Sequence, residues 1–160
     1  MRPLLLGEAP SRTGDRYWRF PLSGGPARSI CTWMGWEPEG STPGGWYWAL
    51  RERFDTVNLV ERWPGPQGKG AAFPMSVARP AWEEFGRHVE HRVVVVLGAR
   101  LQRLASLAGP HQWATSTAPD GRRLDVVAVP HTSGLNLVYN DVAERERTAV
   151  TLREAMERAS

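Results

Sequence analysis

Cysteine and lysine are nearly absent from this sequence, which has one of each, Cys31 and Lys69, among 160 residues. A single cysteine excludes an intrachain disulfide, a four-thiolate zinc site and an iron–sulfur cluster held by this chain alone. Long apolar runs are missing too: the longest strong run, residues 93–97, is far shorter than the ~18 residues that a membrane-spanning helix needs. The first apolar stretch is also too short for a signal peptide. We therefore expect a cytoplasmic protein that makes no contact with a membrane.

Arginine and tryptophan are abundant instead. Of the 20 basic residues, 19 are arginine, and eight positions are tryptophan. Arginine binds phosphates through two hydrogen bonds and stacks on flat rings, but a GC-rich gene would give the same bias without a functional cause. The net charge of +3 and the pI of 9.6 permit a nucleic-acid partner without requiring one. The length is typical of one domain, and no change in composition marks a second.

Four short apolar runs without polar alternation predict buried parallel strands, at residues 3–6, 56–60, 93–97 and 124–129. Apolar residues at helical spacing predict helices over residues 76–90, 99–108 and 141–158. Strands that alternate with helices are typical of a parallel sheet with helices on both faces. We therefore expect an α/β fold, a three-layer α/β/α sandwich with a central four-stranded parallel sheet.

Polar side chains follow three of the four predicted strands. Glu8 comes directly after the first strand and before the rigid Pro10, Asn58 lies near the end of the second, and residues 130–136 after the last read Pro-His-Thr-Ser-Gly-Leu-Asn. In an open parallel sheet, ligands bind outside the carboxyl ends of the strands. The positions of these residues are a first argument for an enzyme.

Each of these residues also has an ordinary structural interpretation. His131 can donate a hydrogen bond to an oxygen that becomes negative in a transition state, or it can be a satisfied structural histidine. Glu8 can face a ligand, or it can be a solvated acid in a turn. Leu135 can pack normally, or it can be an apolar wedge of the kind that base-unstacking proteins insert into a duplex. The sequence has no phosphate-binding loop and no dinucleotide fingerprint.

Five segments, in order, resemble motifs of the uracil-DNA glycosylase superfamily and chiefly of its family 4. They are residues 7–10 with Asp15 (resembling Gly-Glu-Ala-Pro-Gly-x-x-Glu-Asp), 20–24 (Pro-Phe-x-Gly), 56–60 (Thr-Asn-x-Val), 94–104 (Val-x-Leu-Gly-x-x-Ala) and 131–136 (commonly His-Pro-Ser-x-x-x). Each motif is short, but their order and spacing fit over about residues 3–158, nearly the whole chain.

The resemblance implies hydrolysis of the N-glycosidic bond between a base and deoxyribose in DNA, after the base has been flipped out of the duplex. By this analogy, His131 stabilises the negative charge of the departing base. An acid of the first motif, Glu8 in preference to Asp15, orients water or offsets the positive charge of the sugar. Phe20 stacks on the flipped base, and Asn58 hydrogen-bonds its Watson–Crick edge. Uracil is the family's default substrate, and a modified pyrimidine would suit a variant pocket.

The resemblance also implies contacts with the DNA around the flipped base. Ser133 and the backbone at Gly134 would hold a phosphate, and Leu135 would fill the gap left in the stack. The full set of expected DNA contacts is Ser11, Arg12, Ser133, Gly134, Leu135 and Asn136. The enzyme implied is a monomer that needs neither a metal ion nor another cofactor.

The sequence departs from family 4 in several places. Four cysteines of that family hold an iron–sulfur cluster, and Cys31 alone cannot. Ser11 stands where the first motif has its second glycine, and Thr132 stands where the second motif has proline. The tryptophan-rich residues 33–48 have no counterpart in the motifs. Most of these aromatic residues are expected to pack as local core, and an aromatic platform for bases is the alternative.

Two other functions stay open at this point. The departures at Ser11 and Thr132 suit a non-catalytic module of the same fold that binds damaged or single-stranded DNA. A nucleoside or nucleotide hydrolase would keep the fold and make Leu135 ordinary packing. The basic residues that surround the first motif and follow the second strand could line a groove for the DNA backbone, or they could be a solvated surface. They are Arg12, Arg16, Arg19, Arg28, Arg62 and Lys69.

Overall fold

The computed structural model describes residues 1–10, 21–22, 24–38, 44–62, 74–117, 120–132 and 137–160. Strands and helices alternate along much of this part of the chain. The strands are β1 (Leu4–Gly7), β2 (Asp55–Asn58), β3 (Val93–Leu97), β4 (Ala114–Thr117) and β5 (Arg123–Val129). The helices are α1 (Gly25–Met34), α2 (Gly45–Arg51), α3 (Met75–His88), α4 (Ala99–Leu104) and α5 (Val142–Ala159), with a 3₁₀ turn, η1 (Leu137–Asn140), before α5.

The sheet has the strand order β2-β1-β3-β5-β4. The four strands predicted from apolar runs are present and parallel to one another. The prediction of a four-stranded, all-parallel sheet is wrong, because β4 adds a fifth strand antiparallel to β5. This edge strand reads Ala-Thr-Ser-Thr and is exposed along its length, so it carries none of the apolar pattern by which the other strands were predicted.

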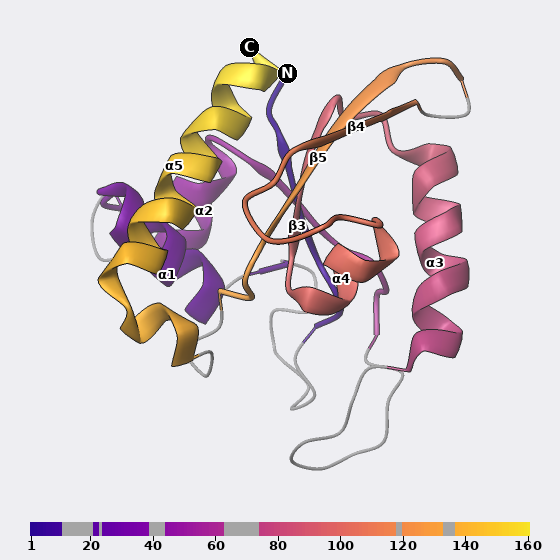
Figure 1. Ribbon diagram of the computed structural model, residues 1–160. Coiled ribbons are helices and arrows are strands. Elements are labelled where there is room, and N and C mark those ends of the chain that lie inside the picture. Colours follow the sequence, from indigo (N-terminus) through magenta and orange to yellow (C-terminus); the bar gives the residue numbers. More distant parts are fainter. Residues whose placement is uncertain (11–20, 23, 39–43, 63–73, 118–119, 133–136) are drawn as a thin grey trace.

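Helices cover both faces of the sheet (Figure 1), as a three-layer α/β arrangement requires. On one face Leu5, Val95 and Val127 pack with residues of α1, α2 and α5. On the other, Leu6 and Val96 pack with residues of α3 and α4. The central strand β3 reads Val-Val-Val-Val-Leu and is buried on both faces, which explains why its sequence does not alternate with polar residues.

The predicted helices are found, with shifted ends. Helix α3 lies within two residues of its predicted bounds, and Asp141 caps α5 by accepting a 2.9 Å hydrogen bond from the backbone N–H of Ala143. Helix α4 stops at Leu104, well before the predicted end at residue 108, and Ser106 beyond it has a left-handed φ of 55°. Among the described residues, no helix combines the length and the apolar character needed to cross a bilayer.

Helices α1 and α2 were not predicted, and they contain four aromatic residues of the tryptophan-rich segment, Trp33, Trp46, Tyr47 and Trp48. Trp36 and Trp46 pack against the core between these helices and the sheet, and the Trp33 ring lies 4.3 Å from the Tyr139 ring. Trp48 differs from them because 55% of its surface is exposed. The local-core interpretation therefore holds for Trp33, Trp36 and Trp46.

Candidate active site

The carboxyl ends of the parallel strands β1, β2, β3 and β5 lie along one edge of the sheet (Figure 1). Pairing continues past the strands: Leu59 N–H donates to the Gly7 carbonyl oxygen at 2.8 Å, and Val60 N–H donates to that of Glu8 at 3.1 Å. At the next exit, Gly98 N–H donates to the carbonyl oxygen of Val129 at 2.9 Å. These bonds hold the segments that carry Glu8, Asn58 and His131 at one edge of the sheet.

Gly98 is the point where Glu8 and His131 approach each other. A Cβ atom at this position would lie 3.5 Å from His131 Cβ, 3.7 Å from His131 Cδ2 and 3.8 Å from Glu8 Oε1. The carboxylate and the imidazole therefore border the same small space. Gly98 also has a φ of 101°, in the region that favours glycine, as it turns from β3 into α4. The turn both requires glycine and leaves room between the two side chains.

Glu8 is held by an arginine that sequence reasoning missed. Arg100 Nη1 donates to Glu8 Oε2 at 3.1 Å, and the two side chains are 18% and 21% exposed, respectively. Burial raises the pKa of the Glu8 carboxyl, while the positive charges of Arg100 and Arg103 act in the opposite direction. The signal in the sequence was the position of Arg100, two residues after Gly98, which follows the third predicted strand. This strand ends at the same edge of the sheet as the strand before Glu8.

His131 lies directly after Pro130 at the end of β5 and is only partly exposed. Burial lowers the pKa of its imidazole, so the ring is neutral at pH 7 and carries one N–H donor. A neutral imidazole can still donate a hydrogen bond to an oxygen that gains negative charge. The structure thus places a carboxylate and a neutral hydrogen-bond donor at one site.

Asn58 lies beside Gly7, the residue before Glu8, and the absence of a side chain at Gly7 leaves room for its amide. A Cβ atom on Gly7 would lie 2.5 Å from Asn58 Oδ1 and 2.7 Å from Leu22 Cδ2, which is too close for any other residue without movement. The Asn58 amide therefore packs directly against the backbone at the end of β1. A fixed primary amide can both donate and accept, as recognition of a base edge requires.

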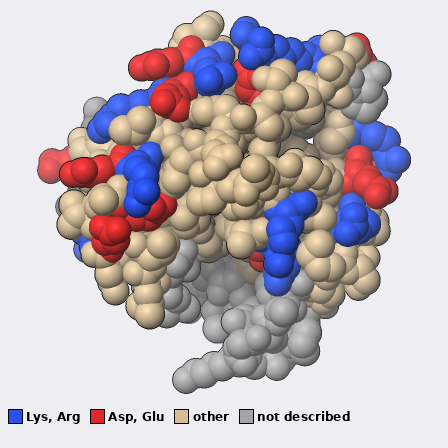
Figure 2. All heavy atoms as spheres, in the orientation of Figure 1, with Lys and Arg blue, Asp and Glu red and all other residues tan. Residues whose placement is uncertain are grey.

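Of the predicted site residues, the structure brings together Glu8, Asn58 and His131. The others fall outside the described residues: Ser11, Arg12, Asp15, Phe20, Ser133, Gly134, Leu135 and Asn136. Of the basic residues proposed for a groove, Arg28 and Arg62 are described and exposed. Figure 2 shows that arginine side chains are mixed with acidic ones on the face in view, so the described part of that face has no single patch of positive charge.

Thr132, the residue that stands where the second motif has proline, is fully buried. Its hydroxyl oxygen has no hydrogen-bond partner among the described residues. Proline has no such group, so the substitution places a polar atom next to His131 without giving it an evident structural bond.

An iron–sulfur cluster does not fit this chain. Cys31, its only cysteine, is buried in α1, and its Sγ contacts the carbonyl oxygen of Trp46 in α2 at 3.4 Å. Burial raises the pKa of the thiol to about 11, so it stays protonated and is a poor metal ligand. Among the described residues, no three side chains of His, Cys, Asp or Glu come together as a metal site.

The arrangement of Glu8, Asn58 and His131 suits the cleavage of a bond that separates charge, because the carboxylate can face a developing cation and the imidazole a developing anion. In the comparisons with known proteins, the model of the Uracil DNA glycosylase superfamily matches residues 1–155. No curated protein matches the chain. The matched region includes the whole sheet and every residue of the candidate site, and the chain belongs to the uracil DNA glycosylase superfamily.

Proposed function

We propose that this protein is a DNA glycosylase that hydrolyses the N-glycosidic bond of a flipped uracil or modified pyrimidine and leaves an abasic site. The observation that carries the proposal is the approach of Glu8 and His131 to the same point at Gly98, at the carboxyl edge of the sheet. The superfamily match supports a base-excising activity, and the site supplies groups for both charges that such a reaction generates.

The reaction is a hydrolysis in which the bond between C1′ and the base nitrogen breaks and its electron pair goes to the base. Water bonds to C1′, and the proton that it loses neutralises the base. The Glu8 carboxylate, oriented by Arg100, would offset the positive charge on the sugar or orient the water. The neutral His131 ring would donate its N–H to a carbonyl oxygen of the departing base.

Recognition of the base would fall to Asn58, whose amide would hydrogen-bond the Watson–Crick edge. Phe20 would stack on the base, and Asp15 is the second candidate for the acid. Ser11, Arg12, Ser133, Gly134 and Asn136 would contact the DNA backbone, and Leu135 would fill the space left in the stack. A monomer acting without a cofactor is the simplest form consistent with this set of residues.

The proposal is tested with labelled oligonucleotides that contain uracil, hydroxymethyluracil, hypoxanthine or modified cytosines. After incubation with the protein, alkali cleaves the strand wherever a base has been removed. His131→Ala should lower the rate by roughly 10²–10³-fold, the usual loss when a group that stabilises a developing anion is removed. Glu8→Gln and Asn58→Ala should also lower it strongly. His88→Ala is the matched control, since His88 is 72% exposed on α3, outside the candidate site.

The same panel separates the alternatives. Tight binding to these oligonucleotides without any product would favour the non-catalytic DNA-binding module over the enzyme. Release of base from free nucleosides, but not from DNA, would favour the nucleoside or nucleotide hydrolase. Either result would remove the glycosylase proposal.

A further inference from the structure

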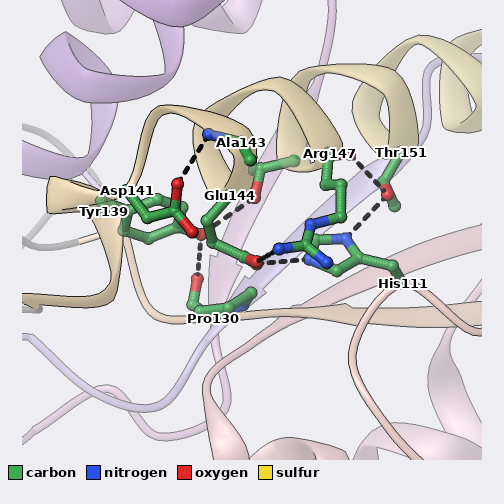
Figure 3. A network of polar contacts seen from close by, with 9 residues as sticks. His111, Pro130, Tyr139, Asp141, Ala143, Glu144, Arg147 and Thr151 are labelled. Atoms are coloured by element: carbon green, nitrogen blue, oxygen red, sulfur yellow. Dashed lines mark hydrogen bonds and ion pairs between the residues drawn. The ribbon is translucent and has the colours of Figure 1, made fainter.

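A hydrogen bond joins η1 to the backbone next to His131. Tyr139, in η1, donates its hydroxyl hydrogen to the carbonyl oxygen of Pro130, with 2.7 Å between the two oxygens (Figure 3). Pro130 is the residue directly before His131, at the end of β5. The bond therefore joins η1 to the end of β5, and its acceptor belongs to the residue that precedes the imidazole of the candidate site.

Tyr139 is itself fixed from two helices. Its side chain is only 6% exposed, and its ring lies 4.3 Å from the ring of Trp33 in α1. From α5, Thr148 Oγ1 donates to the Tyr139 hydroxyl at 3.3 Å, and the Arg145 guanidinium donates to the Tyr139 carbonyl oxygen. The hydroxyl is therefore held where it meets Pro130 rather than being free to rotate away.

The phenol also keeps the proton that the bond needs. Burial, and to a smaller degree the nearby Glu144 carboxylate, raise the pKa of Tyr139 well above its ordinary value. Glu144 is fixed in turn by His111 Nε2 at 2.6 Å and by Arg147 at 3.2 Å (Figure 3). Tyr139 therefore keeps its hydroxyl hydrogen, and can donate it, at any pH used for an assay. Side chains of α5 hold it in place.

We propose that Tyr139 is a positioning residue for His131: by binding the Pro130 carbonyl oxygen, it fixes the backbone from which the imidazole projects into the site. The inference rests on the proposed glycosylase function, in which His131 faces the departing base. Tyr139 does not touch the reacting atoms. Its effect comes from geometry, since a misplacement of about 1 Å can cost about 10²-fold in rate.

Tyr139→Phe tests the proposal, because it removes the hydroxyl and keeps the ring that packs on Trp33. On the oligonucleotide from which the wild type removes the base fastest, kcat should fall roughly ten- to a hundredfold while KM changes little. The reason is that the displaced group, the His131 imidazole, acts in the bond-breaking step and not in substrate binding. The second readout is the ring ¹⁵N spectrum of His131 in the free protein. A loosened ring is better solvated, so the pKa of His131 should rise toward its ordinary value.

Thr115→Val is the matched control for lost stability. Thr115 Oγ1 donates to Asp125 Oδ1 at 2.7 Å, and Asp125 lies at the amino end of β5, about 20 Å of strand away from His131. This variant loses a side-chain hydrogen bond on the same strand and should keep kcat and the His131 spectrum. Equal loss of kcat in both variants would overturn the proposal, as would a folded Tyr139→Phe protein with unchanged kcat and an unchanged His131 spectrum.

Thr148→Val provides a second, milder test if Tyr139→Phe does not fold. It removes the longer hydrogen bond to the Tyr139 hydroxyl, and it should shift both readouts in the same direction by a smaller amount; no shift in either would overturn the proposal. The spectrum of His131 needs no catalysis. If the wild type excised no base from any oligonucleotide, the proposed function would fail, and the spectrum would still decide whether Tyr139 positions His131.

Discussion

Arg100 shows how one residue sets the chemistry of another at the sheet edge. The described charged groups that face Glu8 are Arg100, bonded to it, and Arg103, one turn further along α4, with the neutral His131 beyond Gly98. Burial raises the pKa of Glu8, and the two arginines limit that rise. Because the ionised carboxylate is the form that can face a cationic sugar, activity should increase with pH as Glu8 loses its proton.

Arg100→Met should move this increase in activity to higher pH. The variant removes the arginine that lowers the pKa of Glu8 more, so this pKa rises further and more of the carboxyl is protonated at a given pH. The measurement is kcat/KM against pH for the wild type, Arg100→Met and Arg103→Met. Relative to the wild type, the rise of kcat/KM with pH should shift less in Arg103→Met than in Arg100→Met. Arg100→Lys should restore part of the wild-type profile. An unchanged acid limb in Arg100→Met would show that Arg100 does not control Glu8.

Gly98 makes a second prediction at the scale of a single residue. Gly98→Ala should destabilise the fold by about 1–3 kcal/mol, because the backbone at Gly98 lies in a region that only glycine adopts freely. The variant should also abolish activity, because the new methyl group enters the space between Glu8 and His131. Gly35→Ala is the control: its φ is 69° and nothing lies near its Cβ. It should lose stability in denaturant unfolding and keep activity. Activity in Gly98→Ala close to that of Gly35→Ala would contradict the site.

At the scale of elements, the sequence predicts the strands and helices whose buried residues form a recognisable apolar pattern. The strands β1, β3 and β5 and the helix α3 have that pattern, and their predicted bounds differ from the observed ones by only one or two residues. Strand β4 is exposed and gives no such signal. Helix α1 does have an apolar stripe, of Ala27, Ile30, Cys31 and Met34, but it begins at Gly25 without a side-chain cap and was not predicted. Position along the chain, together with family resemblance, predicted Glu8, Asn58 and His131 as site residues, and the structure places all three at the carboxyl edge of the sheet. Arg100 and Tyr139 depend on contacts across the fold.

The hairpin formed by β4 and β5 makes a prediction about acid stability. Asp125 accepts hydrogen bonds from Thr115 in β4 and from Arg123, and Arg158 of α5 lies 3.6 Å from its second oxygen. Burial acts to raise the pKa of Asp125, but these contacts together outweigh burial and hold the pKa below its ordinary value. The ionised form therefore contributes stability above the pKa of an unfolded aspartate, about 4, and this contribution is lost as pH falls through the lower folded value.

Asp125→Asn should accordingly lower the free energy of unfolding by about 1–3 kcal/mol at neutral pH, since it weakens the charge-assisted bonds to Arg123 and Thr115. The difference from the wild type should shrink as the pH falls below about 4. Urea unfolding at several pH values measures both effects. A difference that stays constant with pH would mean that the charge of Asp125 does not stabilise the hairpin.

At the scale of the whole molecule, the candidate site lies at the carboxyl ends of the parallel strands, and a set of stabilising contacts lies at their amino ends. Glu8, Gly98 and His131 lie at the carboxyl edge, and both chain ends lie at the opposite edge, where Met1 contacts Ala159 (Figure 1). The contacts of Asp125 with Thr115 and Arg158 stabilise the fold at this same edge, far from the candidate site. Changes there should act on stability alone, whereas changes at the carboxyl edge should act on catalysis.

Mass spectrometry of the products formed from duplex and single-stranded oligonucleotides that carry the candidate bases tests the glycosylase proposal most directly. We expect one intact free base for each abasic site in the wild type and in His88→Ala, and a rate lower by roughly 10²–10³-fold in His131→Ala. DNA that is bound but releases no base, on every oligonucleotide tested, would contradict it. So would base release that continues at the wild-type rate in His131→Ala.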